Sequence, residues 1–354
     1  MSWLPSSSNT TATIIEYSQG YPDVPLGVAQ AIDLIFGCFL IHIFALLGLV
    51  GTGLNVLILS RCNITSDSSN ILLVSLSVAD FLFCLTLPFS YSQSFLSRLM
   101  DSISYARLVK IGLQYCKVLG RIVFCTSITL VGVISAERCL VVYFPFKAAG
   151  ILKASRIKFT VVCVYVINAA LFSPLLYSFK QEFVYVERYQ DYLPVILPSE
   201  FYKDNYEAIN FEVGVLYNNA VLGSSMLLTL VATPATAVKL WLATNIRAKL
   251  TRRKSSFEPK VAKIFVIVCT VNLMAYGPFI CFDTAINFLD GYSLQSNSYR
   301  VFVNVTDFSG ALSACINFII YVTMSKKFQS SYTHLFQQCR LVLRKNHVLI
   351  SSRY

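Results

Sequence analysis

Seven charged side chains that could do chemistry lie within or beside long apolar stretches of this 354-residue chain, where most residues carry no charge. They are Asp80, Lys117, Arg121, Glu137, Arg138, Asp283 and Asp307. Within a bilayer each charge costs roughly 2.5–3.5 kcal/mol or more, so such residues face protein or water and often bind ions or ligands. The alternative for each is a snorkelling or hydrated side chain that serves stability alone.

Asp80 is the most deeply placed of these charges, inside the apolar run LSVADFL of residues 76–82. Polar side chains stand at similar depths in other stretches, namely Asn55, Ser127, Ser313 and Asn317. Carboxylate and hydroxyl oxygens suit a small hard cation such as Na⁺. We therefore expect a cation site near Asp80, with plain hydrogen bonding between helices as the alternative.

A second group of charges lies nearer the other side of the expected bilayer. Lys117 and Arg121 are four residues apart and share one helix face. Asp283 and Asp307 occupy the corresponding depth of two later stretches. We predict a ligand pocket here, in which two cations favour an anionic group and two acids a basic one. An Arg121–Asp307 pair would instead make the cluster structural.

A third group, Glu137 and Arg138, stands at the end of its stretch. Glu258 opens a later stretch on the same side, so an Arg138–Glu258 pair would tie two helix ends together. Breaking such a latch frees the arginine and lets a helix move. A static surface pair would contribute only about 0–1 kcal/mol.

The elements that must position these groups are spanning helices. Apolar residues make up 55% of the chain and charged residues 13%, about half the charged share of a soluble domain. Spanning needs about 20 mostly apolar residues, and seven stretches qualify. They are residues 34–60, 69–93, 108–142, 159–179, 213–238, 264–282 and 299–324.

We therefore predict an all-α membrane protein, a seven-transmembrane helix bundle over residues 34–324. Its N-terminal segment is residues 1–33 and its tail residues 325–354. The loops over residues 61–68, 143–158 and 239–263 and the tail carry 18 Lys/Arg against two acids, leaving out Lys239 at the membrane edge. The segments on the opposite side carry seven Lys/Arg against twelve acids. The positive-inside rule then places the N-terminus outside and the C-terminus in the cytosol. The net charge of +11 thus indicates contact with the lipid bilayer and no nucleic-acid partner.

The acidic set of loops suggests an extracellular surface. The loop over residues 180–212 has a net charge of −4, which would attract a basic peptide, although a solvated acidic loop explains it equally. Asn9 begins an Asn-Thr-Thr glycosylation acceptor on the same side. An odd number of spans without internal repeats disfavours an inverted-repeat transporter.

Five short motifs follow one another at particular spacings along the chain. They are Gly53-Leu54-Asn55-Val56, Leu76-Ser77-Val78-Ala79-Asp80, Glu137-Arg138-Cys139, Ala275-Tyr276-Gly277-Pro278 and Asn317-Phe318-Ile319-Ile320-Tyr321. In order and spacing the chain resembles the rhodopsin-like (class A) family of G-protein-coupled receptors over about residues 34–339. Leu87-Pro88-Phe89 is similar to peptide and chemoattractant receptors, so we expect a divergent member of that kind.

The resemblance implies a receptor of the plasma membrane that passes an extracellular signal to a heterotrimeric G protein. Helices would rearrange around Arg138, with Glu137, Glu258 and Tyr321 as switch residues and Tyr276 near the ligand. It also implies a short amphipathic eighth helix after the seventh span. Cys339 then follows that helix as a candidate for palmitoylation.

Departures from the family pattern are as informative as the matches. Phe318 replaces the seventh-span proline, Tyr276 replaces a tryptophan, and Asn272 stands where a phenylalanine is usual. None of the 11 cysteines lies in residues 180–212, so the family's disulfide to that loop cannot form and we expect no disulfide.

The function that we predict is therefore G-protein-coupled reception of a ligand, either a peptide or a carboxylate-bearing molecule. One alternative is a non-signalling, scavenging or constitutively active receptor with degraded switches. Another is a membrane transporter or channel. No enzyme is expected, because the chain has three histidines, no metal-ligand spacing and no phosphate loop. No cofactor is expected beyond Na⁺ near Asp80.

Overall fold

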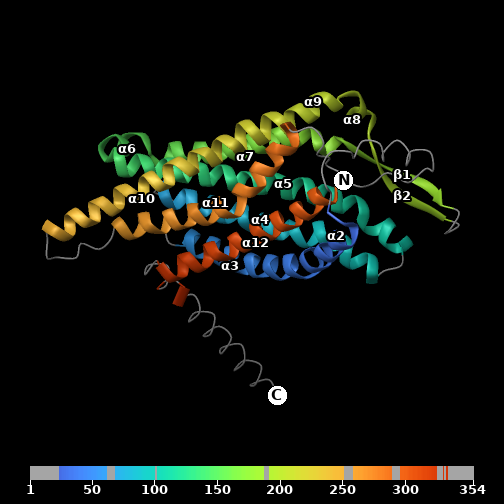
Figure 1. Ribbon diagram of the computed structural model, residues 1–354, viewed down its shortest axis with the longest axis horizontal. Coiled ribbons are helices and arrows are strands. Elements are labelled where there is room, and N and C mark those ends of the chain that lie inside the picture. The colour runs from blue at the N-terminus through green and yellow to red at the C-terminus, as the bar shows by residue number, and fades with distance from the viewer. Residues whose placement is uncertain are drawn as a thin grey trace, which may run out of the picture.

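The computed structural model shows a bundle of long helices that run along one axis (Figure 1). It describes residues 24–61, 68–99, 102–186, 191–250, 258–288 and 296–324, together with residues 330, 332 and 333. Within this part of the chain, seven helices are long and apolar enough to cross a membrane. This confirms the predicted seven-helix bundle. Most of the proposed eighth helix, together with Asn9 and Cys339, lies outside the described residues.

The first span combines α2 (Leu26–Ile32), the π-helix η1 (Asp33–Leu40) and α3 (Ile41–Arg61). The next three are α4 (Ser68–Leu99), α5 (Ser102–Tyr143) and α7 (Ala154–Tyr177), with the short α6 (Pro145–Ile151) between the last two. The fifth span combines α9 (Tyr206–Asn210), the π-helix η4 (Phe211–Gly223) and α10 (Ser224–Leu250). The sixth and seventh are α11 (Glu258–Phe288) and α12 (Asn297–Met324).

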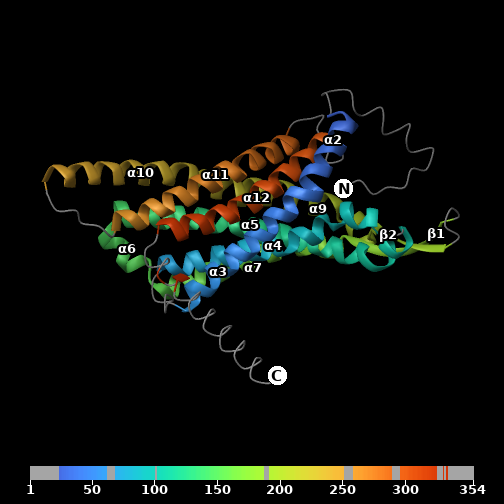
Figure 2. The same ribbon diagram turned by 90° about the horizontal axis from the view of Figure 1, so that it is seen from below.

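The remaining elements lie at one end of the bundle. Strands β1 (Phe179–Val186) and β2 (Asp191–Pro198) form an antiparallel hairpin, followed by α8 (Glu200–Asp204). Figures 1 and 2 show the hairpin projecting from one end and α6 lying toward the other. We call these the hairpin end and the α6 end. The sequence predicted a loop where the hairpin forms.

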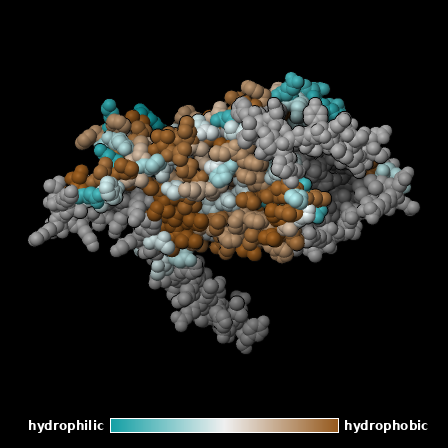
Figure 3. All heavy atoms as spheres, in the orientation of Figure 1, coloured by the Kyte–Doolittle hydropathy of each residue, from teal (hydrophilic) through white to brown (hydrophobic). Residues whose placement is uncertain are grey.

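Each long helix buries one face inside the bundle and exposes the opposite face on its surface. Helix α5 runs through the middle of the bundle in both ribbon views and is the most enclosed span (Figures 1 and 2). Hydrophobic side chains cover the middle of the visible surface, whereas hydrophilic ones gather toward its ends (Figure 3). An apolar exterior of this kind is what a lipid-embedded bundle requires, because lipid cannot satisfy polar groups.

Two apolar cores fill the interior. The core toward the α6 end contains Leu72, Leu76, Ile134, Phe265 and Tyr321. The core toward the hairpin end contains Phe83, Phe124, Phe172, Tyr217 and Tyr276. Asp80 immediately follows Ala79 of the first core and precedes Phe83 of the second, so the buried carboxylate lies where the two cores meet.

Phe318 has a clear packing role in place of the expected proline. Helix α12 is 28 residues long and continues without interruption past Phe318. A Cβ added to Gly51 of α3 would lie only 3.0 Å from the Phe318 Cβ and Cγ atoms, so the phenylalanine packs directly on that glycine. The ring thus joins the first and seventh spans, and no proline kink forms at that position.

Candidate functional site

Asp80 is the centre of a buried polar group in the middle of the bundle. The Ser127 hydroxyl of α5 donates to its Oδ1 at 2.7 Å, and the Asn317 amide of α12 donates to its Oδ2 at 3.0 Å. Asp80 is 3% exposed, so the carboxylate joins three helices out of contact with water. The structure therefore brings together three of the four residues that we assigned to a cation site.

Ser313, the fourth, makes a different contact. Its hydroxyl donates to Oδ1 of Asn272 at 3.4 Å, and the Asn272 amide donates to the Val268 carbonyl at 2.8 Å. Asn272 is fully buried in α11. This unusual asparagine therefore links α11 to α12 beside Asp80. We use the term polar core for Asp80, Ser127, Asn272, Ser313 and Asn317.

Two buried asparagines, Asn55 and Asn317 of the polar core, retain hydrogen-bonding capacity. Asn55 is fully buried, and neither its amide oxygen nor its amide nitrogen has a hydrogen-bond partner among the described residues. The same holds for Asn317 Oδ1. Buried polar atoms of this kind are normally satisfied by water or an ion. The oxygens present, one carboxylate with hydroxyl and amide groups, fit a hard monovalent cation.

Arg138 is held at the α6 end by an ion pair and an aromatic ring. Its Nε lies 2.6 Å from Glu137 Oε2, and its guanidinium carbon lies 3.8 Å from the centroid of the Phe265 ring in α11. Glu137 Oε1 also accepts from the hydroxyls of Ser68 and Ser69 of α4, at 3.4 and 3.2 Å. The arginine is therefore connected to α4 through Glu137 and to α11 through Phe265.

The contact with Phe265 was not predicted, because the sequence suggested Glu258 as the partner on α11. Glu258 is the first residue of that helix, and its side chain lies outside the described part. An arginine over a desolvated aromatic face is stabilised by about 2 kcal/mol or more. Phe265 thus supplies a contact between α5 and α11 that needs no acid.

Three further contacts join the α6-end halves of the helices. The Tyr143 hydroxyl of α5 donates to the Ala235 carbonyl of α10 at 3.1 Å, and the Lys239 ammonium lies 5.6 Å from the centre of the Tyr143 ring. Ser135 donates to the Cys269 sulfur of α11 at 3.1 Å. These contacts bring α10 and α11 against α5 on either side of Arg138.

Toward the hairpin end lies a cluster of charged and aromatic side chains, which we call the Arg121 cluster: Tyr91, Lys117, Arg121, Phe279 and Asp307. The Tyr91 hydroxyl donates to Asp307 Oδ2 at 2.7 Å. The Arg121 guanidinium carbon lies 4.3 Å from the Phe279 ring centroid. Asp307 is within electrostatic range of both cations.

The structure places Tyr276, another predicted ligand residue, outside this cluster and does not describe the side chain of Asp283. Tyr276 is 1% exposed and packs edge-on against Phe124 at 5.0 Å between ring centroids. Phe124 in turn lies 5.5 Å from the Arg121 guanidinium, so Tyr276 lies behind the cluster, toward the polar core. Asp283 belongs to α11, but its side chain lies outside the described part.

An ion pair that sequence reasoning missed joins the first and seventh spans at the hairpin end. Arg300 pairs with Asp33, and the Asn304 amide also donates to Asp33. Nearby, the Asn297 amide donates to the Val24 carbonyl at 3.0 Å. Arg300 and Asp33 were counted only as loop charges, although their opposite signs next to adjacent spans could have suggested the pair.

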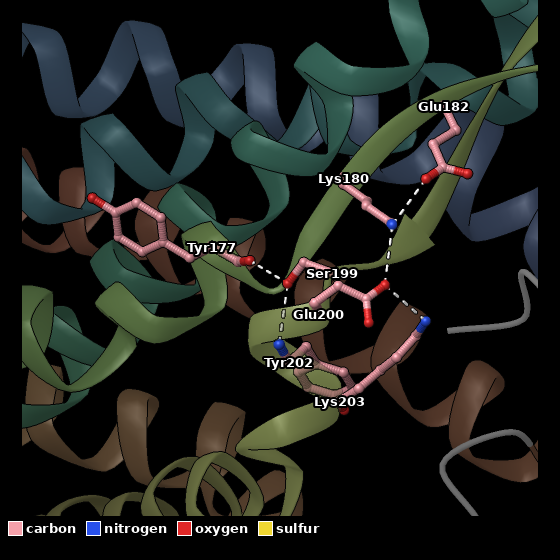
Figure 4. Close-up of polar contacts among 7 residues, drawn as sticks. All are labelled: Tyr177, Lys180, Glu182, Ser199, Glu200, Tyr202 and Lys203. Atoms are coloured by element: carbon pink, nitrogen blue, oxygen red, sulfur yellow. Dashed lines mark hydrogen bonds and ion pairs between the residues drawn. The ribbon is translucent and has the colours of Figure 1, made fainter.

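The base of the hairpin is fastened by charge, as Figure 4 shows. Lys180 Nζ lies 2.8 Å from a Glu182 oxygen and 3.2 Å from Glu200, which also pairs with Lys203 at 3.1 Å. Hydrogen bonds from Lys203 and Lys180 hold the pKa of the Glu200 carboxyl below its ordinary value. Hydrogen bonds to Glu182 and Glu200 raise the pKa of Lys180.

Backbone and ring contacts complete this base. The Ser199 hydroxyl donates to the Tyr177 carbonyl at 2.7 Å and accepts from the Tyr202 amide at 3.1 Å, capping α8 (Figure 4). The Phe179 and Tyr202 rings stack with centroids 6.2 Å apart. Nine cysteines in the described part of the chain are free thiols. Here, then, noncovalent contacts position the hairpin.

Comparison with known proteins identifies relatives of this chain. C-C chemokine receptor type 9 of Homo sapiens is 25% identical over 296 residues, which cover 80% of this chain and 72% of that receptor. C-C chemokine receptor type 8 of Homo sapiens is 24% identical over 317 residues, covering 86% and 78%. Somatostatin receptor type 2 of Sus scrofa is 24% identical over 310 residues, covering 84% and 76%.

The family comparison covers most of the bundle. The model of the family described as "7 transmembrane receptor (rhodopsin family)" matches residues 52–321, from α3 to the last turn of α12. Members of this family are G-protein-coupled receptors, which are multi-pass proteins of the plasma membrane and not enzymes. With its seven spans and this match, the chain belongs to the rhodopsin family of seven-transmembrane receptors.

Proposed function

We propose that this receptor passes an extracellular signal to a heterotrimeric G protein through release of Arg138. The hairpin end faces the outside and the α6 end the cytosol, in accordance with the charge asymmetry of the loops. The single observation that carries the proposal is the position of Arg138, 8% exposed and in contact with Phe265 of α11. A two-state bundle in which that contact breaks would present the arginine to a partner.

The contacts around Arg138 describe the resting state. Glu137 fixes the arginine on α5, and Phe265 attaches α11 to it. An outward displacement of α11 at the α6 end removes the ring from the guanidinium and opens the space between the two helices. A ligand drives this change only to the extent that it binds the open state more tightly.

The cytosolic surface next to Arg138 has a docking feature for the G protein. Phe146 of α6 is 96% exposed, and Trp241 and Ile246 of α10 are 65% and 56% exposed. Phe146 directly follows Pro145, the first residue of α6, so the helix holds the ring away from the bundle. An exposed aromatic residue is a suitable anchor for a protein partner.

We assign Na⁺ to the polar core as a stabiliser of the resting state. Asp80 and Ser127 would provide oxygen ligands, and Asn55 and Asn317 have amide oxygens without partners among the described residues. Ser313 would take part through its bond to Asn272. A cation there offsets the cost of a buried carboxylate that joins three helices.

The ligand is a peptide or another carboxylate-bearing molecule. The names of the relatives refer to chemokines and somatostatin, which makes a peptide the first choice. The acid-rich outer surface would steer a basic peptide to the receptor.

The test needs no ligand. Purified receptor in nanodiscs is mixed with purified G-protein heterotrimers, and GTPγS uptake is compared for the wild type, Phe265→Leu and Phe265→Leu/Arg138→Ala. We expect Phe265→Leu to raise uptake and the second substitution to abolish the gain. The matched control is Phe265→Leu/Arg156→Ala, because Arg156 is an exposed arginine of α7 in the α6-end half of the bundle. This control should keep the gain in uptake. Equal background uptake in every variant would instead favour the non-signalling receptor.

A further inference from the structure

The first and seventh spans are joined where both begin, at the hairpin end. Arg300 of α12 pairs with Asp33 of η1, and the Asn304 amide donates to the same carboxylate. Earlier in the chain, the Val24 backbone amide donates to the Ser298 hydroxyl at 3.3 Å. The beginning of the first span is therefore held against the beginning of α12 at two places.

Aromatic contacts join the same two spans further along. The Phe308 ring of α12 lies edge-on against Phe36 of η1 and Phe44 of α3, with centroids 5.3 and 5.2 Å apart. Edge-on pairs of this kind add to the stabilisation from apolar burial. The Cys315 thiol of α12 then donates to the Phe44 carbonyl at 3.3 Å. One ring of α12 is thus held by two rings of the first span.

Glycines bring the two backbones close together in the middle of the spans. A Cβ added to Gly48 would lie 3.6 Å from both the Ala311 carbonyl oxygen and the Ala314 Cβ. One turn further along, Phe318 packs on Gly51 at still shorter range. Surfaces that interlock so closely do not deform continuously, so one helix cannot slide past the other without a discrete repacking. The two spans are therefore in contact from the hairpin end to Phe318.

Helix α11 is attached differently at its two ends. At the hairpin end, Phe282 stacks on Phe302 of α12 with centroids 4.0 Å apart. Toward the α6 end, α11 meets α5 through the Phe265 ring and through the Cys269 sulfur, which is a weak acceptor. Each of these two contacts involves side chains only, so it can break while the helices stay intact. Helix α11 can therefore swing at the α6 end while it remains attached at the hairpin end.

We infer that the first and seventh spans form one rigid unit, the α3–α12 unit, which stays intact when the receptor changes state. The moving part is α11, which swings against this unit. The inference rests on the proposed function for that swing, and it adds which helices stay together. It also gives Phe318 a purpose, because this residue keeps α12 straight and in contact with Gly51 where a proline would bend the helix.

Two engineered disulfides test which helices separate. In Gly48→Cys/Ala314→Cys the two Cβ atoms would lie 3.6 Å apart, within the range of about 3.5–4.5 Å that a disulfide needs. This variant also carries Cys84→Ala, because the Cys84 sulfur lies 2.6 Å from the new Cβ position. In Ser135→Cys the new thiol replaces a hydroxyl that lies 3.1 Å from the Cys269 sulfur, so its disulfide would fasten α5 to α11.

Both disulfides are formed with copper phenanthroline in purified receptor in nanodiscs, with and without Phe265→Leu. The yield of each disulfide is followed over time by mass spectrometry of its peptides. GTPγS uptake with purified G protein is then measured before and after reduction with dithiothreitol. Cys84→Ala without the engineered cysteines, treated in the same way, is the control for oxidation of the native thiols.

We expect the disulfide between α3 and α12 to form completely in both backgrounds and to leave intact the gain in uptake that Phe265→Leu produces. The disulfide between α5 and α11 should form more slowly in Phe265→Leu. Once formed, it should abolish the gain, and dithiothreitol should restore it. Because each oxidised receptor is compared with itself after reduction, a folding defect cannot imitate these results.

Three results would overturn the inference. An incomplete α3–α12 disulfide in either background would show that these spans separate. A loss of uptake on forming that disulfide, reversed by reduction, would show that α12 must move against α3. A gain that survived the α5–α11 disulfide would show that α11 is not the moving part. The disulfide yields are read without a G protein, so they decide the inference even if no variant takes up GTPγS, which would count against the proposed function alone.

Discussion

Arg138 and Phe265 lie face to face across two spans, with the guanidinium carbon 3.8 Å from the ring centroid. Phe265 is 1% exposed, so the contact is shielded from water. The partner of Arg138 is therefore a neutral ring, whereas the sequence suggested the acid Glu258. A cation–π contact persists at high salt better than an exposed ion pair, because a buried interaction is screened less.

Loss of this ring should raise basal signalling. Phe265→Leu removes about 1–2 kcal/mol of stabilisation from the resting state, which corresponds to a rise of about fivefold to thirtyfold in GTPγS uptake while the active state is rare. Phe265→Tyr keeps a ring over the guanidinium and should stay close to the wild type. If Tyr and Leu variants gave the same uptake, Phe265 would act only as a packing residue.

Sodium should stabilise the receptor through Asp80. We expect a higher thermal midpoint in NaCl than in choline chloride at equal ionic strength, because a ligand that binds only the folded state adds RT ln(1 + [L]/Kd) to its stability. Asp80→Asn should abolish the difference. Asp33→Asn removes a carboxylate that pairs with Arg300 and should retain it. A sodium effect that survived in Asp80→Asn would place the ion elsewhere.

The Tyr91 hydroxyl should be needed for stability. Tyr91→Phe leaves Asp307 without a donor that lies 2.7 Å away, and the loss of such a charged hydrogen bond costs about 1–3 kcal/mol. The thermal midpoint should therefore fall by several degrees. Tyr115→Phe on α5 is the control, since Tyr115 is 43% exposed and should tolerate the change. Equal midpoints for both variants would argue against the proposed role of Tyr91.

The hairpin base should depend on pH through Glu200. The pKa of this carboxyl is lowered by Lys203 and Lys180, so the folded state gains stability above the ordinary value of 4.5. That gain is lost as the pH falls through the lowered pKa. We expect the wild type to have a higher thermal midpoint than Glu200→Gln at pH 6 and the two to converge in more acidic buffer. Glu207→Gln, at another exposed acid near the hairpin, should show no such convergence.

The count of spans could be predicted because the length of an apolar stretch is a property of the sequence alone. The link from Asp80 to Ser127 and Asn317 was also foreseeable, since a charge in that position must face polar groups of other helices. The position of each residue along its span can be read from the sequence, and this position was enough to predict that these side chains meet.

The partner of Arg138 could not be predicted in the same way. Whether Glu258 or Phe265 meets the arginine depends on the rotation of α11 about its axis, which depth along the sequence does not specify. The hairpin was missed for another reason. Its two strands place apolar residues on both faces, as the consecutive pairs Phe183–Pro194 and Val184–Leu193 show, so no simple alternation indicated a sheet.

The uninterrupted α12 has a mechanical consequence. Over its 28 residues it measures about 42 Å at 1.5 Å per residue, and it carries Asn304 and Asp307 near one end and Asn317 and Tyr321 near the other. Without a proline there is no built-in hinge between them. If the receptor signals as proposed, a displacement of α12 at the hairpin end would reach the α6 end as rotation or sliding of one stiff helix, with Phe318 kept in contact with Gly51.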